Sequence, residues 1–188
     1  MSVLLPKRDG RVDPTHPLFF FAGPVRGGGD WQYRAYQELQ KQLSSRFCAA
    51  IPMRYEDGHP LLSEQLSETS NPRTFERQLA WENHHMDLAA GWMIGRRGCL
   101  LFWLGNESKE DPHPGPQPYA MSTRRELGKW GARLESRRRL RIVVGAEPEF
   151  FGLDEFEREL DEAFGSEFPI HTTLEDTVRA AVVRSSIA

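Results

Sequence analysis

The sequence CLLFWLG at residues 99–105 is the most clearly buried strand in the chain. Its uninterrupted apolar residues leave no polar face, which is typical of a strand covered on both sides by other elements. Four more segments carry shorter or weaker forms of this pattern: PLFFFA at 17–22, CAAIPM at 48–53, LRIVVGA at 140–146 and FPIHT at 168–172. We predict all five segments to be strands.

Segments with helical character stand between and after these strands. They cover residues 31–47, 73–95, 124–135, 153–165 and 174–186. Asp30 is the expected N-cap of the first helix, and Thr172 or Thr173 that of the last. Strands that alternate with helices imply right-handed crossovers and a mostly parallel sheet. The sequence therefore predicts an α/β three-layer sandwich with helices on both faces of the sheet.

The chain of 188 residues has the length of one domain. Residues 1–16 are polar and carry prolines, so we expect an N-terminal arm followed by a single domain over residues 17–188. The polar, turn-rich residues 54–73 predict a long surface loop, and loops of this length are often functional.

The composition indicates a soluble globular protein. The formal charge is −3, with 39% hydrophobic and 27% charged residues, which disfavours a protein that binds nucleic-acid polymers through a basic surface. Membrane-spanning runs are missing from the sequence, and the N-terminus becomes charged too early for a secretory signal. Cys48 and Cys99 lie in apolar runs and read as buried free thiols. We expect a cytoplasmic protein without membrane contact.

Two loops of the predicted fold meet at one edge of the sheet, because parallel sheets present the carboxyl ends of their strands together. Ligands bind at that edge. The loop GPVRGGGD at residues 23–30 follows one strand, and the proline-rich loop at 106–121 follows another. The glycine-rich loop has neither GxGxxG spacing nor a Walker lysine, so a phosphate site and a flexible turn are both open interpretations.

Glu126 comes just after the second loop, in STRRELGKW at residues 122–130. If Ser122 caps the helix, Glu126 lies in its first turn, where backbone N–H groups stabilise an anion. We therefore expect an ionised carboxylate, suited to act as a nucleophile. The structural alternative is a capping-box glutamate paired with Thr123, and one residue could serve in both roles.

Glu82 shares a helical stripe with Leu79 and Met86, so we expect its side chain to face the core. Burial raises the pKa of a carboxyl group, which can then hold or deliver a proton. One charged and one protonatable carboxyl group are the requirement for cleaving a glycosidic bond. A solvent-facing charge is the alternative. His84 and His85 are adjacent and point in different directions, so we predict no metal site.

The motifs FFFAGP, DW, AWENHHMDLAA, LLFWL and STRRELGKW occur in the order found in nucleoside 2-deoxyribosyltransferase-like proteins, which the chain resembles over residues 18–145. The resemblance implies a flavodoxin- or Rossmann-like sandwich with a mostly parallel five-stranded sheet. It implies cleavage or transfer at the N-glycosidic bond of a (deoxy)nucleoside or nucleotide, without a cofactor. It also implies a homo-oligomer in which a neighbouring chain completes the pocket.

The resemblance also assigns roles to individual residues. Glu126 matches the nucleophile, which forms a covalent glycosyl-glutamate intermediate, and Glu82 matches the acidic residue that contacts the base and helps to protonate it. Positions that match the substrate pocket are Gly23, Pro24, Asp30, Trp31, Ser122 and Thr123. Tyr119 joins them as an aromatic side chain that could stack on a nucleobase.

One departure from the family pattern bears on the reaction. Some transferases carry an aspartate six residues before the nucleophile, where this chain has Ala120. The difference weighs against efficient transfer between free bases, but not against hydrolysis. Two alternatives therefore stay open: a non-catalytic module that binds a nucleotide or a nucleotide-derived signal, and a glycohydrolase acting on a dinucleotide such as NAD.

Overall fold

The computed structural model describes residues 2–6, 13–44, 46–52, 58–63, 75–93 and 97–186. Its strands are β1 (Ser2–Leu4), β2 (Leu18–Ala22), β3 (Cys48–Ala50), β4 (Gly98–Leu104), β5 (Ile142–Ala146) and β6 (Ile170–His171). Its helices are α1 (Trp31–Leu43), α2 (Pro60–Ser63), α3 (Phe75–Ala90), α4 (Met121–Ser136), α5 (Leu153–Phe164) and α6 (Leu174–Ser185). The predicted α/β alternation is confirmed.

Within the described residues, the strands form one parallel sheet of six in the order β1-β3-β2-β4-β5-β6. Strands β2 to β6 alone have the order of a flavodoxin-like sheet, with a change of winding direction between β2 and β4. The predicted number of five strands is corrected to six, because β1 adds an edge strand.

Strand β1 lies inside the segment predicted to be an arm. Ser2–Leu4 pair with β3, and Val3, Leu4 and Leu5 are buried. The expectation of an arm is wrong for these residues because so short an apolar run gives no strand signal by itself. Residues 7–12 of the predicted arm lie outside the described residues, as do most of the residues predicted to form the 54–73 loop.

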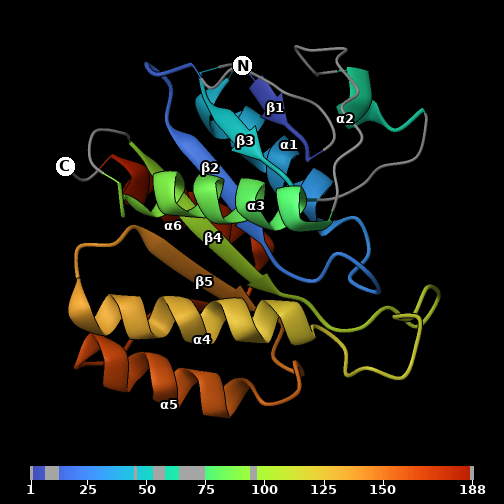
Figure 1. Cartoon of the computed structure of the whole chain (residues 1–188), viewed down its shortest axis with the longest axis vertical. Coiled ribbons are helices and arrows are strands. Elements are labelled where there is room, and N and C mark those ends of the chain that lie inside the picture. Colours follow the sequence, from blue (N-terminus) through green and yellow to red (C-terminus); the bar gives the residue numbers. More distant parts are fainter. Residues whose placement is uncertain are drawn as a thin grey trace.

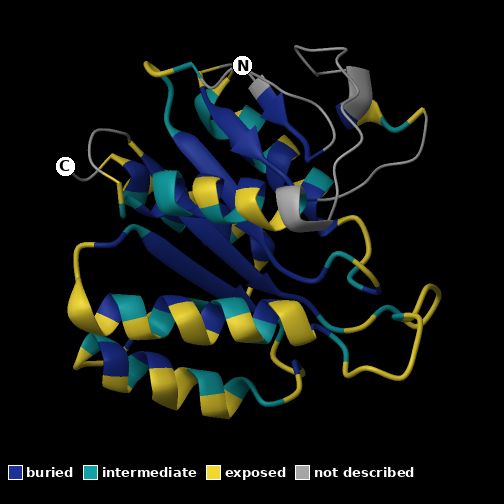
Figure 2. Ribbon diagram, viewed as in Figure 1, coloured by how far each residue is buried: buried dark blue, intermediate teal, exposed yellow. Residues whose placement is uncertain are grey.

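Helices cover both faces of the sheet (Figure 1). Helices α3, α4 and α5 lie in front of the strands in that view, and α1 and α6 lie behind them. Two separate apolar clusters fill the spaces between the layers. Strands β2, β4 and β5 are buried along their whole length, whereas the outer sides of the helices are exposed (Figure 2). The three-layer sandwich is therefore confirmed.

Helix caps differ in how well the sequence predicts them. Thr173 caps α6 as predicted, because its hydroxyl accepts a hydrogen bond of 3.1 Å from the backbone N–H of Asp176. Asp30 stands at the N-cap of α1, but its side chain makes no capping hydrogen bond. Helix α4 is capped by Ala120, in the left-handed conformation at φ 58°, so Ser122 lies within the helix.

Gly145 in β5 permits close packing of the sheet against α6. A Cβ atom at this position would overlap Oγ1 of the buried Thr177 and lie 2.9 Å from its Cβ and Cγ2 atoms. Rotation of the threonine cannot relieve both contacts. We expect Gly145→Ala to lower the free energy of unfolding by about 1–3 kcal/mol, measured by urea denaturation. The control is Gly128→Ala in α4, where the added Cβ meets no atom within 4 Å. That variant should gain about 0.5–1 kcal/mol, and equal effects at the two positions would contradict the prediction.

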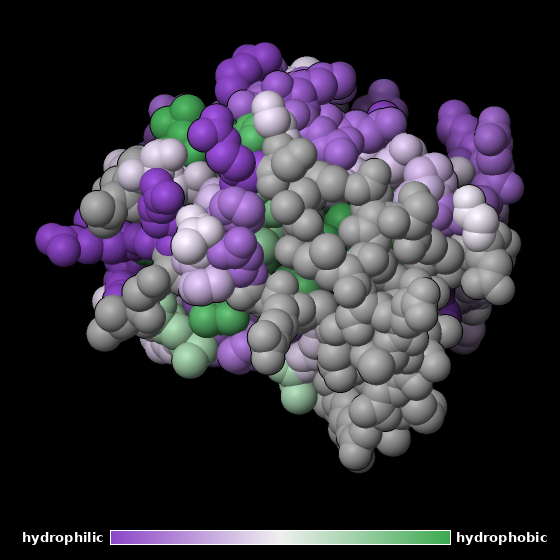
Figure 3. All heavy atoms as spheres, turned by 90° about the horizontal axis from the view of Figure 1, so that it is seen from above, coloured by the Kyte–Doolittle hydropathy of each residue, from purple (hydrophilic) through white to green (hydrophobic). Residues whose placement is uncertain are grey.

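None of the helices in the described part of the chain combines the length and apolarity needed to cross a bilayer. On the face seen from above, the described side chains are mostly hydrophilic (Figure 3). Cys48 and Cys99 are both buried, as predicted, and neither forms a disulfide bond within the described residues. Burial raises the pKa of the Cys99 thiol to about 12.

Candidate functional site

The loops that follow β2 and β4 leave the sheet side by side at its change of winding direction. The backbone N–H of Ser108 donates a hydrogen bond of 2.6 Å to the carbonyl of Gly27, which joins the two loops directly. Gly27 has φ 73°, and a Cβ there would lie 2.7 Å from the backbone nitrogen of His113. This edge is the expected place for a ligand in a sheet of this topology.

Tyr119, at the end of the β4–α4 loop, forms hydrogen bonds with residues at the beginning of that loop. Its hydroxyl lies 2.9 Å from the carbonyl of Gly105 and 3.2 Å from that of Asn106. Burial, with the nearby charges of Glu107 and Glu147, raises the pKa of the Tyr119 hydroxyl above its usual range. The side chain is half-buried and holds the loop that leads into α4. Its predicted role in stacking on a base stays a prediction.

Helices α3 and α4 run parallel along one face of the sheet and are joined by side chains. Lys129 Nζ donates to Asn83 Oδ1 at 2.6 Å, and one turn further Arg133 pairs with Asp87. Glu126 lies within electrostatic reach of Glu82. We call the residues Glu82, Asn83 and Asp87 of α3, with Glu126, Lys129 and Arg133 of α4, the α3–α4 seam.

Glu126 lies at the border between the buried and exposed sides of α4. Its neighbours Thr123, Leu127 and Trp130 are all buried. Burial raises the pKa of the Glu126 carboxyl to about 7, and the negative charge of Glu82 adds to the effect. The charges of Lys129 and Arg125 act in the opposite direction. Near neutral pH this carboxyl group therefore exists in both protonation states.

The predicted electrostatics of Glu126 are wrong. The sequence predicts a first-turn carboxylate with a low pKa, but α4 begins at Met121, which places Glu126 in the second turn. The stabilising effect of the helix N-terminus falls off within the first turn. Burial against the sheet, together with Glu82, then determines the direction of the shift. The capping-box alternative is also wrong, because Ala120 is the N-cap and no side chain caps the helix.

Glu82 is half-buried on the side of α3 that faces α4. Gln78, one turn before it, donates a hydrogen bond of 2.8 Å to Glu82 Oε1. The two acidic residues predicted from the sequence are thus close enough for the charge of Glu82 to raise the pKa of Glu126.

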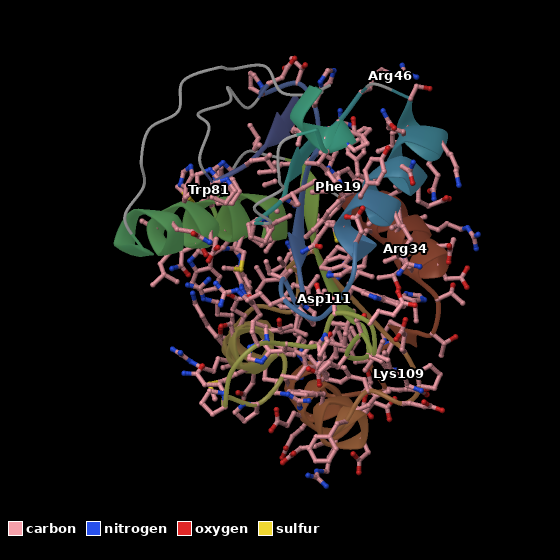
Figure 4. The ribbon with its side chains drawn as sticks, turned by 90° about the vertical axis from the view of Figure 1, so that its right-hand side faces the viewer. Phe19, Arg34, Arg46, Trp81, Lys109 and Asp111 are labelled. Carbon is pink, nitrogen blue, oxygen red and sulfur yellow. The ribbon has the colours of Figure 1, made fainter. Side chains whose placement is uncertain are left out.

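Other predicted site residues lie on the opposite face of the sheet. Trp31 is fully buried in the cluster beneath α1 and α6, and its Nε1 donates to the carbonyl of Pro24 at 2.8 Å. A Cβ on Gly23 would overlap the Trp31 ring and lie 2.6 Å from the Trp103 carbonyl oxygen. Gly23, Pro24 and Trp31 are therefore packed against one another, with no space between Gly23 and the Trp31 ring. Figure 4 shows the same separation, with Trp81 on α3 and Arg34 on α1 on opposite sides of the strands.

The remaining predicted residues have different surroundings. Asp30 is exposed, and its Oδ2 lies 3.2 Å from Nε2 of His59. Ser122 is exposed in the first turn of α4, while Thr123 is 3% exposed and sits one turn before Glu126. The structure therefore places Thr123 one turn before Glu126, whereas Asp30 lies at the N-terminus of α1.

A cavity of about 220 Å³ lies between α4 and α5. Its lining includes Leu127, Gly131 and Phe156, with Glu135 and Glu159 among the polar residues. Glu126 and Glu82 are not among its lining residues. The cavity therefore lies on the other side of α4 from the seam, and we do not assign the predicted chemistry to it.

Lys129 and Asn83 belong to the site but are not among the residues singled out in the sequence. Their hydrogen bond joins the two helices next to the glutamates, and the charge of Lys129 lowers the pKa of Glu126. The sequence does indicate that Lys129 lies near Glu126, because it is three residues after Glu126 and therefore shares its helix face. The hydrogen bond between Lys129 and Asn83 could not be predicted, because it depends on how α3 and α4 are aligned with each other.

Neither the models of protein families nor the curated proteins give a match to the chain. The family membership suggested by the order of motifs therefore stays a prediction.

Proposed function

We propose that this protein cleaves the N-glycosidic bond of a (deoxy)nucleoside or nucleotide through a covalent intermediate on Glu126. The observation that supports this most directly is the electrostatic interaction of Glu126 with Glu82 across the α3–α4 seam. A pair of carboxyl groups that holds a proton near neutral pH suits a reaction needing both a nucleophile and an acid.

In the proposed reaction, ionised Glu126 attacks the anomeric carbon of the sugar. A bond forms between a carboxylate oxygen and this carbon as the bond to the base nitrogen breaks. The departing base takes a proton from solvent or, in those molecules in which the proton of the pair lies on Glu82, from the carboxyl group of Glu82. Water then attacks the same carbon, which releases the sugar and restores the Glu126 carboxylate. Glu82 accepts the proton from the water and, where solvent protonated the base, returns that proton to solvent.

The experiment is incubation of the protein with a panel of deoxynucleosides, ribonucleosides and their 5′-phosphates, followed by chromatography for free base. In parallel, a 2′-fluoro nucleoside should slow breakdown of the intermediate, so that intact-protein mass spectrometry detects a glycosyl adduct. Peptide mapping should place that adduct on Glu126. Turnover without an adduct on Glu126 would contradict the mechanism.

A binding module is the second candidate, and Ala120 in place of the acidic residue of some relatives favours it. Calorimetry distinguishes the two functions. A binding module would hold a nucleotide that is recovered intact after prolonged incubation, whereas the proposed enzyme would return free base.

A further inference from the structure

The indole N–H of Trp130 is a buried donor in the same helix as Glu126. Trp130 is 1% exposed. Among the described residues, no acceptor lies within hydrogen-bond distance of its Nε1 atom. Most buried polar groups are paired, and one left unpaired costs stability, so such a group calls for an explanation.

The position of the ring places this donor beneath the α3–α4 seam. The Arg133 guanidinium carbon lies 4.5 Å from the centroid of the Trp130 ring and 4.7 Å from that of Trp92. Arg133 also pairs with Asp87 of α3. Trp130 is thus held under the arginine that joins the two helices.

Glu126 is four residues before Trp130, about one helical turn, so the two side chains occupy the same face of α4. Long side chains in a helix lean toward its N-terminus and cover the preceding turn. The Trp130 ring is therefore expected to lean toward the turn of α4 that carries Glu126.

We propose that the Trp130 indole N–H donates a hydrogen bond to Glu126 when this carboxyl group loses its proton, and so positions it for reaction. The inference rests on the proposed function, in which Glu126 attacks as an anion. Hydrogen bonds to a charged acceptor are stronger than those between neutral groups. The orphan donor thus favours the charged form against the burial and the Glu82 charge that oppose it. Arg125 and Lys129 of α4 act in the same direction as Trp130.

The test compares Trp130→Phe with Trp92→Phe. The first variant keeps an aromatic ring but removes the donor, and the second removes an indole from the other ring that contacts Arg133. The Glu126 carboxyl carbon is followed by NMR as a function of pH in protein labelled at glutamate side chains. We expect the titration midpoint of Glu126 to rise by about one pH unit in Trp130→Phe, a tenfold tighter proton binding, and to stay in place in Trp92→Phe. An unchanged midpoint in Trp130→Phe would overturn the inference.

A second measurement needs no variant of Trp130. In the wild-type protein, the indole N–H resonance of Trp130 should shift with pH at the same midpoint as Glu126. In Glu126→Gln that response should disappear. An indole resonance that is insensitive to the ionisation of Glu126 would overturn the inference even if Trp130→Phe fails to fold.

These readouts separate the inference from the proposed function. A protein that shows both titration effects but releases no base from any nucleoside supports the Trp130 contact and contradicts the proposed enzyme. A protein that cleaves nucleosides, but in which the Glu126 midpoint ignores Trp130, does the reverse. In an active protein, the acidic limb of the kcat/KM profile should move with the NMR midpoint in Trp130→Phe.

Discussion

The Glu126→Gln variant should be more stable than the wild-type protein above pH 7, by about 1–3 kcal/mol. Burial and the charge of Glu82 raise the pKa of this carboxyl group from its ordinary value of 4.5 to about 7. A shift of that size corresponds to about 3 kcal/mol at most. Because part of the side chain reaches solvent, we expect the measured value to fall below this limit.

The sign follows from which state binds the proton more tightly. The folded protein binds it more tightly, so wild-type stability is greatest below pH 4.5 with respect to this group and declines as the pH rises to about 7. Glutamine has nearly the same shape and stays neutral. The variant therefore lacks this decline, and the difference between the two proteins should be small at pH 4.5 and full at pH 8.

Urea denaturation at several pH values between 4.5 and 8 measures this difference. Glu135→Gln is the control, since it removes a charge from the exposed side of the same helix. Glu82→Gln should move the decline to lower pH, because the Glu82 charge is one of the two causes that raise the pKa of Glu126. A stability difference between Glu126→Gln and wild type that is constant with pH would contradict a raised pKa of the Glu126 carboxyl group.

The sheet could be predicted from the sequence because its central strands are buried on both faces. The run at 99–105 and the run at 17–22 correspond to β4 and β2, which lie side by side with every residue buried. Continuous apolar runs are the expected consequence of helices on both sides of a parallel sheet. Because these strands alternate with helices along the chain, the sequence also predicts helix layers on both faces of the sheet.

The edge strand β1 could not be predicted on the same grounds. It has only three residues, and its burial depends on pairing with β3 and packing under α1. Nothing local distinguishes Ser2–Leu4 from the start of a polar arm. An edge strand of this kind is specified by the sheet to which it adds.

The candidate site shows which of its features can be predicted from nearby residues in the sequence and which depend on the fold. That Glu82 and Glu126 lie on the same face of the sheet follows from helix periodicity and from the packing of α3 and α4 into one apolar cluster. The direction of the Glu126 pKa shift does not follow from helix periodicity, because it depends on the residue at which α4 begins. Ala120 adopts a left-handed conformation that no alanine signals in sequence, and it moves the helix start ahead of Ser122.

Glu126→Gln should lower kcat for N-glycosidic cleavage by about 10³-fold or more, if the protein is the proposed enzyme. The amide has no negative charge with which to attack the anomeric carbon, and the covalent intermediate cannot form. Glu82→Gln should cost less, about 10²- to 10³-fold, because it removes only the transfer of a proton to the departing base. The measurement is steady-state release of base from the best substrate of the panel.

The two losses should also differ in how they depend on the leaving group. A nucleoside whose base departs readily without protonation should restore much of the rate in Glu82→Gln and little of it in Glu126→Gln. Wild-type kcat/KM should rise with pH through a midpoint near 7 as Glu126 ionises. Since Glu126→Gln is also expected to be the more stable protein above pH 7, a loss of activity there cannot be attributed to unfolding. If Glu126→Gln retained wild-type turnover, the carboxyl pair would be a feature of packing, and cleavage would have to be assigned to other residues.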